Sequence, residues 1–321
     1  MKTLARLAAI ASSVLLLAGA AAAQDYPARP ITLVLPFGAG SGIDPTARLI
    51  ADELGRALKQ PVVIDYKPGA NGAIAATAVA RAAPDGYTIF MTTVSTHSAN
   101  PNLLKSIPYD PIKDFAALSR VGNLPFMMVI DPKIPARSVA EFIAYAKAHQ
   151  GKLSYASANA IGLVAAATLN RIAGLDMVNV PYRVSPQAIG DVIAGRIAMM
   201  FVDFALGSPQ VKAGNVRALA VTTKERSALL PDVPSMTEAG LPSLDLTPWN
   251  ALFAPAGTPK LIINRLNAEL RPILADPRIK ARLAAIGFDA FSSTPEELEQ
   301  FVRDDLAKWT RWVKDAGIQP E

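Results

Sequence analysis

Short, mainly apolar runs flank a helical pattern near the start of the chain. Residues 31–35 and 61–65 predict two buried strands. Between them, apolar residues at helical spacing predict a helix over residues 45–59. A strand, a helix and a second strand form a β-α-β unit, which implies a parallel sheet with a right-handed crossover.

The same alternation continues to the C-terminus. Further strands are predicted at residues 87–92, 153–157, 177–180, 198–202, 217–223 and 249–254. Further helices are predicted at residues 73–83, 138–149, 161–173, 185–194, 259–274, 277–285 and 295–316. The predicted fold is α/β with two lobes, each a mostly parallel sheet flanked by helices, and a ligand cleft between the lobes. The expected division is lobe 1 at 24–124 and 224–321 and lobe 2 at 125–223, with the return crossing in the strand at 217–223.

The loop between the first strand and the first helix is rich in glycine. Gly38, Gly40 and Gly42 occupy alternate positions, where the backbone can turn tightly and bring its amides close to a ligand. Asp44 followed by Pro45 predicts a helix start, with Asp44 as the N-cap. A strand, a glycine loop and a helix N-terminus together predict a cradle for an anion, although such a loop can also be a plain structural turn.

Four loops of similar composition follow predicted strands, at residues 37–44, 93–100, 157–162 and 182–188. They are rich in Gly, Ser, Thr and Asn and hold few charges. Such loops supply amide and hydroxyl donors, and each hydrogen bond to a carboxylate contributes about 1.5–3 kcal/mol. The loops therefore predict a site that binds a carboxylate without needing an arginine.

The first 23 residues have the pattern of a signal peptide. Lys2 and Arg6 precede an apolar segment at residues 7–18, and residues 21–23 fit a small-residue cleavage site. The apolar segment is shorter than the ~20 residues that a membrane span needs. We therefore expect cleavage near Ala23 and export.

Composition excludes several kinds of site. Without Lys2 and Arg6, 30 basic residues face 27 acidic ones, and no basic cluster suggests nucleic acid. The chain has no cysteine, which excludes disulfides, thiolate catalysis and cysteine-based metal sites. His97 and His149 are the two histidines, too few for a histidine-rich metal centre. We expect no cofactor and no metal.

Two other functions compete with carboxylate binding. Ser95, His97 and Ser98 lie in one loop and could serve an exported serine hydrolase, but the Gly-x-Ser-x-Gly turn is absent. The glycine loop also resembles a shortened dinucleotide fingerprint, with Asp65 where a ribose-binding acid would stand. Its third glycine comes one position too early, and an exported chain leaves the cytoplasmic nicotinamide pool.

Short motifs along almost the whole mature chain match one family, in order and at matching separations. They are Tyr-Pro-Ala-Arg-Pro-Ile at 26–31, Val-Leu-Pro-Phe at 34–37, Gly-Ser-Gly-Ile-Asp at 40–44, Lys-Pro-Gly-Ala at 67–70, Ala-Pro-Asp-Gly-Tyr-Thr at 83–88, Tyr-Asp-Pro-Ile-Lys-Asp-Phe at 109–115, Val-Pro-Tyr at 180–182, Leu-Pro-Asp-Val-Pro at 230–234 and Pro-Ala-Gly-Thr-Pro at 255–259. On these motifs, the chain resembles the periplasmic solute receptors of the tripartite tricarboxylate transporter family, also called Bug or TctC-like receptors.

The resemblance implies a type II-like periplasmic binding protein fold whose lobes close on a small carboxylate. It implies a non-catalytic, monomeric receptor that delivers this ligand to the membrane subunits of a tripartite transporter. The ligand could be an aliphatic dicarboxylate, an aromatic acid, an amino acid or a nicotinate-like acid. The ligand-binding residues carried over are Phe37, Gly38, Ala39, Gly40, Ser41, Gly42, Ser95, Thr96, His97, Ser98, Asn100, Ser157, Ala158, Asn159, Gly162, Tyr182, Val184, Ser185, Pro186 and Asp203.

Two loops of the second lobe depart from the family pattern. Residues 158–162 are Ala-Asn-Ala-Ile-Gly where the family commonly has a Gly-Ser-rich loop. Residues 182–185 are Tyr-Arg-Val-Ser where it commonly has a Tyr-Lys pair followed by two or three glycines. Both changes add side chains to this part of the cleft, which favours a ligand with an apolar or differently shaped distal end, or an altered closure. We therefore expect these loops to choose among ligands. Arg183 could bind a second carboxylate, but a solvent-facing position is favoured for it.

Overall fold

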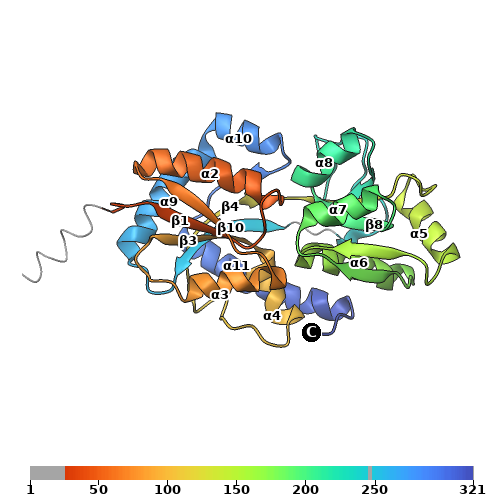
Figure 1. Ribbon diagram of the computed structural model, residues 1–321, viewed down its shortest axis with the longest axis horizontal. Coiled ribbons are helices and arrows are strands. Elements are labelled where there is room, and N and C mark those ends of the chain that lie inside the picture. The colour runs from red at the N-terminus through yellow and green to blue at the C-terminus, as the bar shows by residue number, and fades with distance from the viewer. Residues whose placement is uncertain (1–25, 245–247, 321) are drawn as a thin grey trace, which may run out of the picture.

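The computed structural model describes residues 26–244 and 248–320, which form two lobes that lie side by side, each around one sheet (Figure 1). The predicted signal peptide at residues 1–23 lies outside the described residues. Within the described ranges, no helix has the length and apolar character needed to cross a membrane. The two-lobed α/β fold predicted from the sequence is confirmed.

The first lobe contains a six-stranded sheet in the order β11-β4-β10-β3-β1-β2. Its strands are β1 (Ile31–Leu35), β2 (Val62–Tyr66), β3 (Thr88–Thr93), β4 (Phe115–Asn123), β10 (Trp249–Pro255) and β11 (Asp289–Ala290). β1, β2 and β3 are parallel, and β10 runs antiparallel between β3 and β4. The sheet is thus mostly parallel in strand direction, with β10 and β11 reversed.

Helices cover both faces of this sheet because its inner strands are apolar on both sides, whereas the edge strand β2, which was expected to be buried, is partly exposed, with Val63 at 54%. One face carries α2 (Ile43–Leu58), α9 (Lys260–Ala275) and α10 (Pro277–Ala284), and the other carries α3 (Ala73–Ala80) and α11 (Pro295–Asp315). In β1, Leu33 packs into the cluster of α2 and α9, whereas Val34 packs into the cluster of α3 and α11. Successive residues of a strand point to opposite faces, so a continuous apolar run is needed here.

The second lobe contains a five-stranded sheet in the order β7-β6-β8-β5-β9. Its strands are β5 (Phe126–Ile130), β6 (Ser154–Ser157), β7 (Val178–Pro181), β8 (Met199–Asp203) and β9 (Arg217–Val221). β5 alone runs against the others. Its faces are covered by α5 (Val139–Ala148) and α6 (Ala160–Ala173) on one side and by α7 (Ser185–Ile193) and α8 (Phe204–Lys212) on the other.

The chain leaves the first sheet after β4 and enters the second at β5. It stays with the second sheet beyond β9, because the N–H of Val221 donates to Pro234 O at 2.8 Å and the N–H of Met236 donates to Val221 O at 2.8 Å. After a short 3-10 helix, η3 (Pro242–Leu244), it re-enters the first sheet at β10. The segment expected as the return crossing, residues 217–223, is thus largely the edge strand β9.

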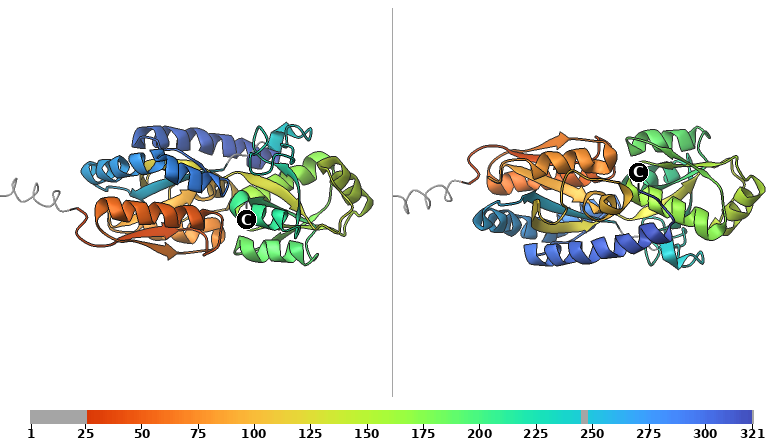
Figure 2. Two further views of the ribbon diagram at one scale, coloured as in Figure 1. Left: turned by 90° about the horizontal axis from the view of Figure 1, so that it is seen from above. Right: turned by 90° about the horizontal axis from the view of Figure 1, so that it is seen from below.

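Helix α11 connects the two lobes. A Thr294–Glu297 capping box begins it, and it runs from the first lobe to the second, as Figure 2 shows. Trp309 and Val313 on its buried face belong to the same apolar cluster as Leu169 of α6 in the second lobe. The lobes therefore share part of one hydrophobic core, beside the places where the chain crosses from β4 to β5 and back into β10.

Two segments differ from what the sequence predicted. Residues 93–101 were expected to form a polar loop, but they continue β3 into a π-helical turn, η2 (Ser95–Ala99), and a short helix, α4 (Asn100–Leu103). The Tyr109 hydroxyl supports this segment by donating to Thr96 O at 2.8 Å, although the His97 Nε2, the Ser98 Oγ and the Asn100 Oδ1 have no partner among the described residues. The sequence also gave no indication of α8, which begins directly after Asp203.

Candidate ligand-binding site

The glycine loop is fixed from within by Asp44. Helix α2 begins at Ile43 with Gly42 as its N-cap, so the prediction that Asp44 is the N-cap was wrong. Instead, the Asp44 carboxylate accepts the Gly40 N–H at 2.8 Å and the Tyr66 hydroxyl at 2.6 Å, and lies 3.0 Å from the Arg48 Nε. These contacts turn Asp44 away from an anion in the cleft and tie the loop to α2 and β2.

Replacing Asp44 with Ala is expected to lower the free energy of unfolding by about 2 kcal/mol, because the Gly40 N–H and the Tyr66 hydroxyl lose a charged acceptor. Urea unfolding would measure the change. Asp65→Ala is the matched control, since Asp65 pairs only with the half-exposed Lys67 and should cost at most about 0.5 kcal/mol. Equal effects of the two substitutions would contradict the tethering role of Asp44.

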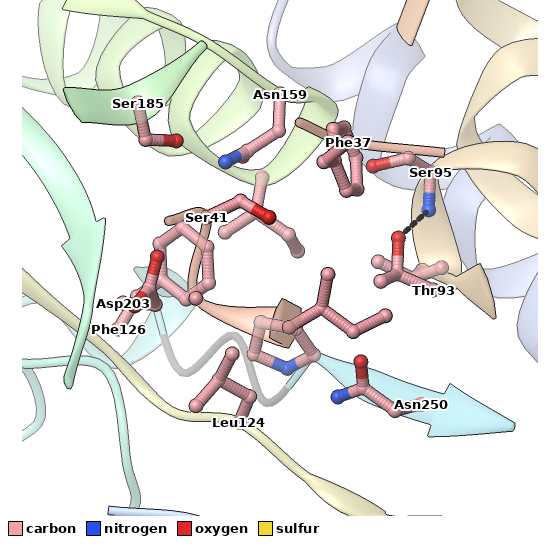
Figure 3. A pocket seen from close by; sticks show the side chains of 15 residues that line it. Phe37, Ser41, Thr93, Ser95, Leu124, Phe126, Asn159, Ser185, Asp203 and Asn250 are labelled. Carbon is pink, nitrogen blue, oxygen red and sulfur yellow. Dashed lines mark hydrogen bonds between the residues drawn. The ribbon is translucent and has the colours of Figure 1, made fainter. Parts of the chain in front are cut away.

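A small cavity of about 40 Å³ lies between the lobes next to this loop; we call it the inner cavity (Figure 3). The first lobe and the hinge region contribute Phe37, Ser41, Gly42, Ile43, Thr93, Val94, Ser95, Leu124, Pro248 and Asn250. The second lobe contributes Phe126, Asn159, Ile161, Ser185 and Asp203.

Hydroxyl and amide groups supply the polar part of the inner cavity. The Ser41 Oγ and the Asn250 Oδ1 are buried and have no hydrogen-bond partner among the described residues. Leaving a buried polar group unpaired costs about 1–3 kcal/mol. A ligand that forms hydrogen bonds with these atoms removes that cost, so the cavity favours a polar ligand.

Asp203 brings the second lobe against the glycine loop. It is the N-cap of α8, and its Oδ1 accepts the Leu206 N–H at 2.9 Å. Its side chain is buried, and burial raises its pKa to about 6 against the opposing effect of backbone N–H donors. A methyl group placed on Gly42 would lie 2.1 Å from the Asp203 Cγ, so the two lobes approach closely only because residue 42 is a glycine.

A wider space of about 430 Å³ adjoins the inner cavity; we call it the outer compartment. Phe37 and Asn159 line both spaces. Residues 69–72 form one wall with four consecutive positive φ angles, of which Ala70 and Asn71 at 46° and 50° are unusual for residues other than glycine. Arg183 is the charged residue of the lining, and the remaining lining residues are Leu104, Ser157, Ala158, Leu163, Asn179, Pro181 and Tyr182.

The structure distributes the residues expected in the site over three places. The inner cavity receives Phe37, Ser41, Gly42, Ser95, Asn159, Ser185 and Asp203, and the outer compartment receives Ser157, Ala158 and Tyr182 with Phe37 and Asn159 again. Gly38 approaches Val184, and Gly40 approaches Pro186, so these four residues extend the contact between the lobes that Gly42 and Asp203 make. The remaining residues line neither space: Ala39, Thr96, His97, Ser98, Asn100 and Gly162.

His97 lies inside the first lobe rather than at the cleft. Its ring stacks on Phe253 with centroids 4.1 Å apart, and its Nδ1 bonds the Thr96 hydroxyl at 2.9 Å. Its Nε2 has no partner among the described residues, so no hydrogen bond joins it to Ser95 or Ser98. This geometry gives no support to a serine hydrolase, and the part of the chain that the structure describes contains no cluster of metal-ligating side chains.

Several cavity residues were not anticipated. Leu124, Phe126, Pro248 and Asn250 come from the strands that link the lobes, and no loop motif identifies them. Asn250 had one usable signal, because an amide within a seven-residue buried strand needs a partner.

Comparisons with known proteins agree on one group. The model of the tripartite tricarboxylate transporter family receptor matches residues 46–318. Protein BugT of Bordetella pertussis is 34% identical over 323 residues, covering 98% of this chain and 98% of BugT. Among solved structures, R. palustris Rpa4515 with adipate has a TM-score of 0.90 at 32% identity and covers 92% of this chain and 100% of that one. MatC from Rhodopseudomonas palustris with bound malate has a TM-score of 0.84 at 32% identity, with 90% and 100% covered.

Proposed function

The chain belongs to the tripartite tricarboxylate transporter receptor family, and on that premise we propose that it delivers a small organic carboxylate to the membrane subunits of such a transporter. Members of this family are periplasmic binding receptors rather than enzymes. The adipate and malate carried by two structural relatives support a carboxylate as the ligand class. A signal peptide cleaved near Ala23, release into the periplasm and a monomeric state are part of the same proposal.

The observation that carries the proposal is the inner cavity with its unpartnered polar groups. A carboxylate there would accept from the Ser41 hydroxyl and from the side-chain N–H groups of Asn250 or Asn159, whose side chains surround one space in Figure 3. The unpaired Asn250 Oδ1 is itself an acceptor, so it would pair with a donor such as a hydroxyl group of the ligand. These groups lie on both lobes, so the ligand joins the lobes. Closure excludes water and strengthens each of these hydrogen bonds.

The two spaces would bind different parts of the ligand. The inner cavity would hold the carboxylate common to all ligands, and the outer compartment would hold the remainder of the molecule. Tyr182 is fixed there because its hydroxyl donates to Asp191 at 2.6 Å, while Arg183 is exposed and forms no ion pair among the described residues. A ligand with a second anionic group would reach Arg183.

A thermal-shift screen tests the proposed function. The mature protein would be heated with malate, adipate, aspartate, benzoate or nicotinate, each at several concentrations. At 100 times its dissociation constant, a ligand stabilises the folded state by about 2.7 kcal/mol, which should raise the Tm by several degrees. Stabilisation by NAD alone, or by no organic acid at all, would refute the proposal.

A further inference from the structure

The inner cavity has an unusual charge for a carboxylate site. Among its 15 lining residues, Asp203 is the one charged side chain, and the lining contains no Lys, Arg or His. An organic anion that enters therefore meets a carboxylate and no cation. In a space from which water is excluded, two ionised carboxylates side by side repel strongly.

Asp203 cannot withdraw from this position. Its side chain is 3% exposed, and its Oδ1 is held by the Leu206 N–H at the start of α8. Gly42 of the opposite lobe packs directly against the carboxyl group. Figure 3 shows an Asp203 oxygen on the side of the cavity that Ser41 and Ser185 share.

No neighbouring cation is placed to neutralise Asp203. Asp44 is the nearest acidic group on the glycine loop, and Arg48 and Tyr66 already bind it. The charged groups of the helices packed against β8 and the glycine loop are Asp44, Arg48, Asp52, Glu53 and Arg56 of α2, Arg171 of α6, Asp191 of α7 and Lys212 of α8, and β5 and β6 carry none. None of them contributes to the raised pKa of Asp203, which burial alone produces.

We propose that the site takes up its organic acid together with one proton, which Asp203 holds as a neutral carboxyl group that donates a hydrogen bond to the ligand's carboxylate. The proton comes from solvent and binds a carboxylate oxygen of Asp203; no other bond forms or breaks. Two carboxyl groups in one dry site characteristically share a single proton. This inference rests on the proposed function and adds that the ligand binds as an anion paired with a protonated Asp203.

Calorimetry measures the proton directly. The acid from the screen that stabilises the protein most would be titrated at pH 7.5 in buffers of different ionisation enthalpy, which gives the protons taken up per ligand. We expect close to one proton per ligand, and a Kd that rises up to about tenfold per pH unit between pH 6.5 and 8.5. The simple carboxylic acids of the screen titrate below this window.

Two variants separate the role of Asp203 from its place as a helix cap. Asp203→Asn supplies a permanent neutral donor, so it should bind at pH 8.5 at least as tightly as the wild type, with neither proton uptake nor pH dependence. Asp276→Asn is the matched control, because Asp276 caps α10 through the Arg278 N–H at 2.7 Å and lines neither space between the lobes. It should leave proton uptake unchanged.

Opposite results would overturn the inference. Binding without proton uptake, together with a loss of affinity of 100-fold or more in Asp203→Asn, would show an ionised Asp203 paired with a cationic group of the ligand, such as an ammonium. The wild-type titration decides this even if the variant fails to fold. If no acid binds at all, the proposed function fails and the inference falls with it, whereas binding without a proton refutes the inference alone.

Discussion

Replacing Gly42 with Ala is expected to abolish ligand-induced closure while leaving the unliganded protein folded. Residue 42 has φ −58° and ψ −28°, which alanine adopts without strain, so the substitution adds only a methyl group. That methyl would lie 2.1 Å from the Asp203 Cγ, about 1.5 Å nearer than van der Waals contact. The lobes can relieve the clash by moving apart, which removes the ligand's contacts to one side.

The Gly42→Ala variant should therefore lose at least about 100-fold in affinity for the acid that stabilises the wild type, a loss near 2.7 kcal/mol. Small-angle X-ray scattering should show no compaction on adding that acid. Gly190→Ala is the control, because a methyl there meets nothing within 4 Å. Wild-type affinity in Gly42→Ala would mean that the Gly42–Asp203 contact is not part of the liganded state.

Local pattern predicted most of the fold. The strands at residues 31–35 and 249–255 are apolar runs that helices bury on both faces, and a helix such as α11 combines an apolar face with a Thr294–Glu297 capping box. Each of these signals arises within a few residues of sequence. The glycine loop was predictable for the same reason, but its glycines were assigned to a ligand, whereas Gly42 packs against Asp203 of the other lobe.

The features that the sequence did not predict depend on contacts between residues far apart in the chain. Asn250 and Leu124 reach the inner cavity because two strands cross between the lobes, and nothing near them in the sequence marks this. The segment around His97 was expected in a loop because Ser, Thr and Asn usually favour turns over helix interiors. Here the Tyr109 hydroxyl pairs with one backbone carbonyl of the segment, that of Thr96, and aromatic rings pack against the imidazole. Composition alone cannot reveal such a partner.

The second large effect that we predict is a loss of folding stability at acid pH, caused by His97. His97 is fully buried, and burial lowers its pKa to about 3, whereas an unfolded chain keeps a value near 6.5. Below pH 6.5 the unfolded state binds a proton that the folded state does not. The contribution of His97 to stability is therefore complete above pH 6.5 and is lost as the pH falls toward 3, by up to about 1.4 kcal/mol per pH unit.

Asp203 acts with the opposite sign. Burial raises its pKa to about 6, so the folded state binds the proton more readily than the unfolded state between about pH 4 and pH 6. Its contribution to stability increases as the pH falls through that range. The two effects partly cancel in the wild type, so the free energy of unfolding of the wild type alone conceals both.

Replacing His97 with Phe isolates the histidine. The phenyl ring can keep the stack on Phe253, and the Thr96 hydroxyl keeps its bonds to Thr92 and to Thr93 O. Urea unfolding of both proteins at pH 7, 6, 5 and 4 should show the wild type losing about 3 kcal/mol relative to His97→Phe over this span. His149→Gln, which removes the other histidine, should follow the wild type. Parallel curves for wild type and His97→Phe would mean that the buried imidazole accepts its proton as readily in the folded protein as in the unfolded chain.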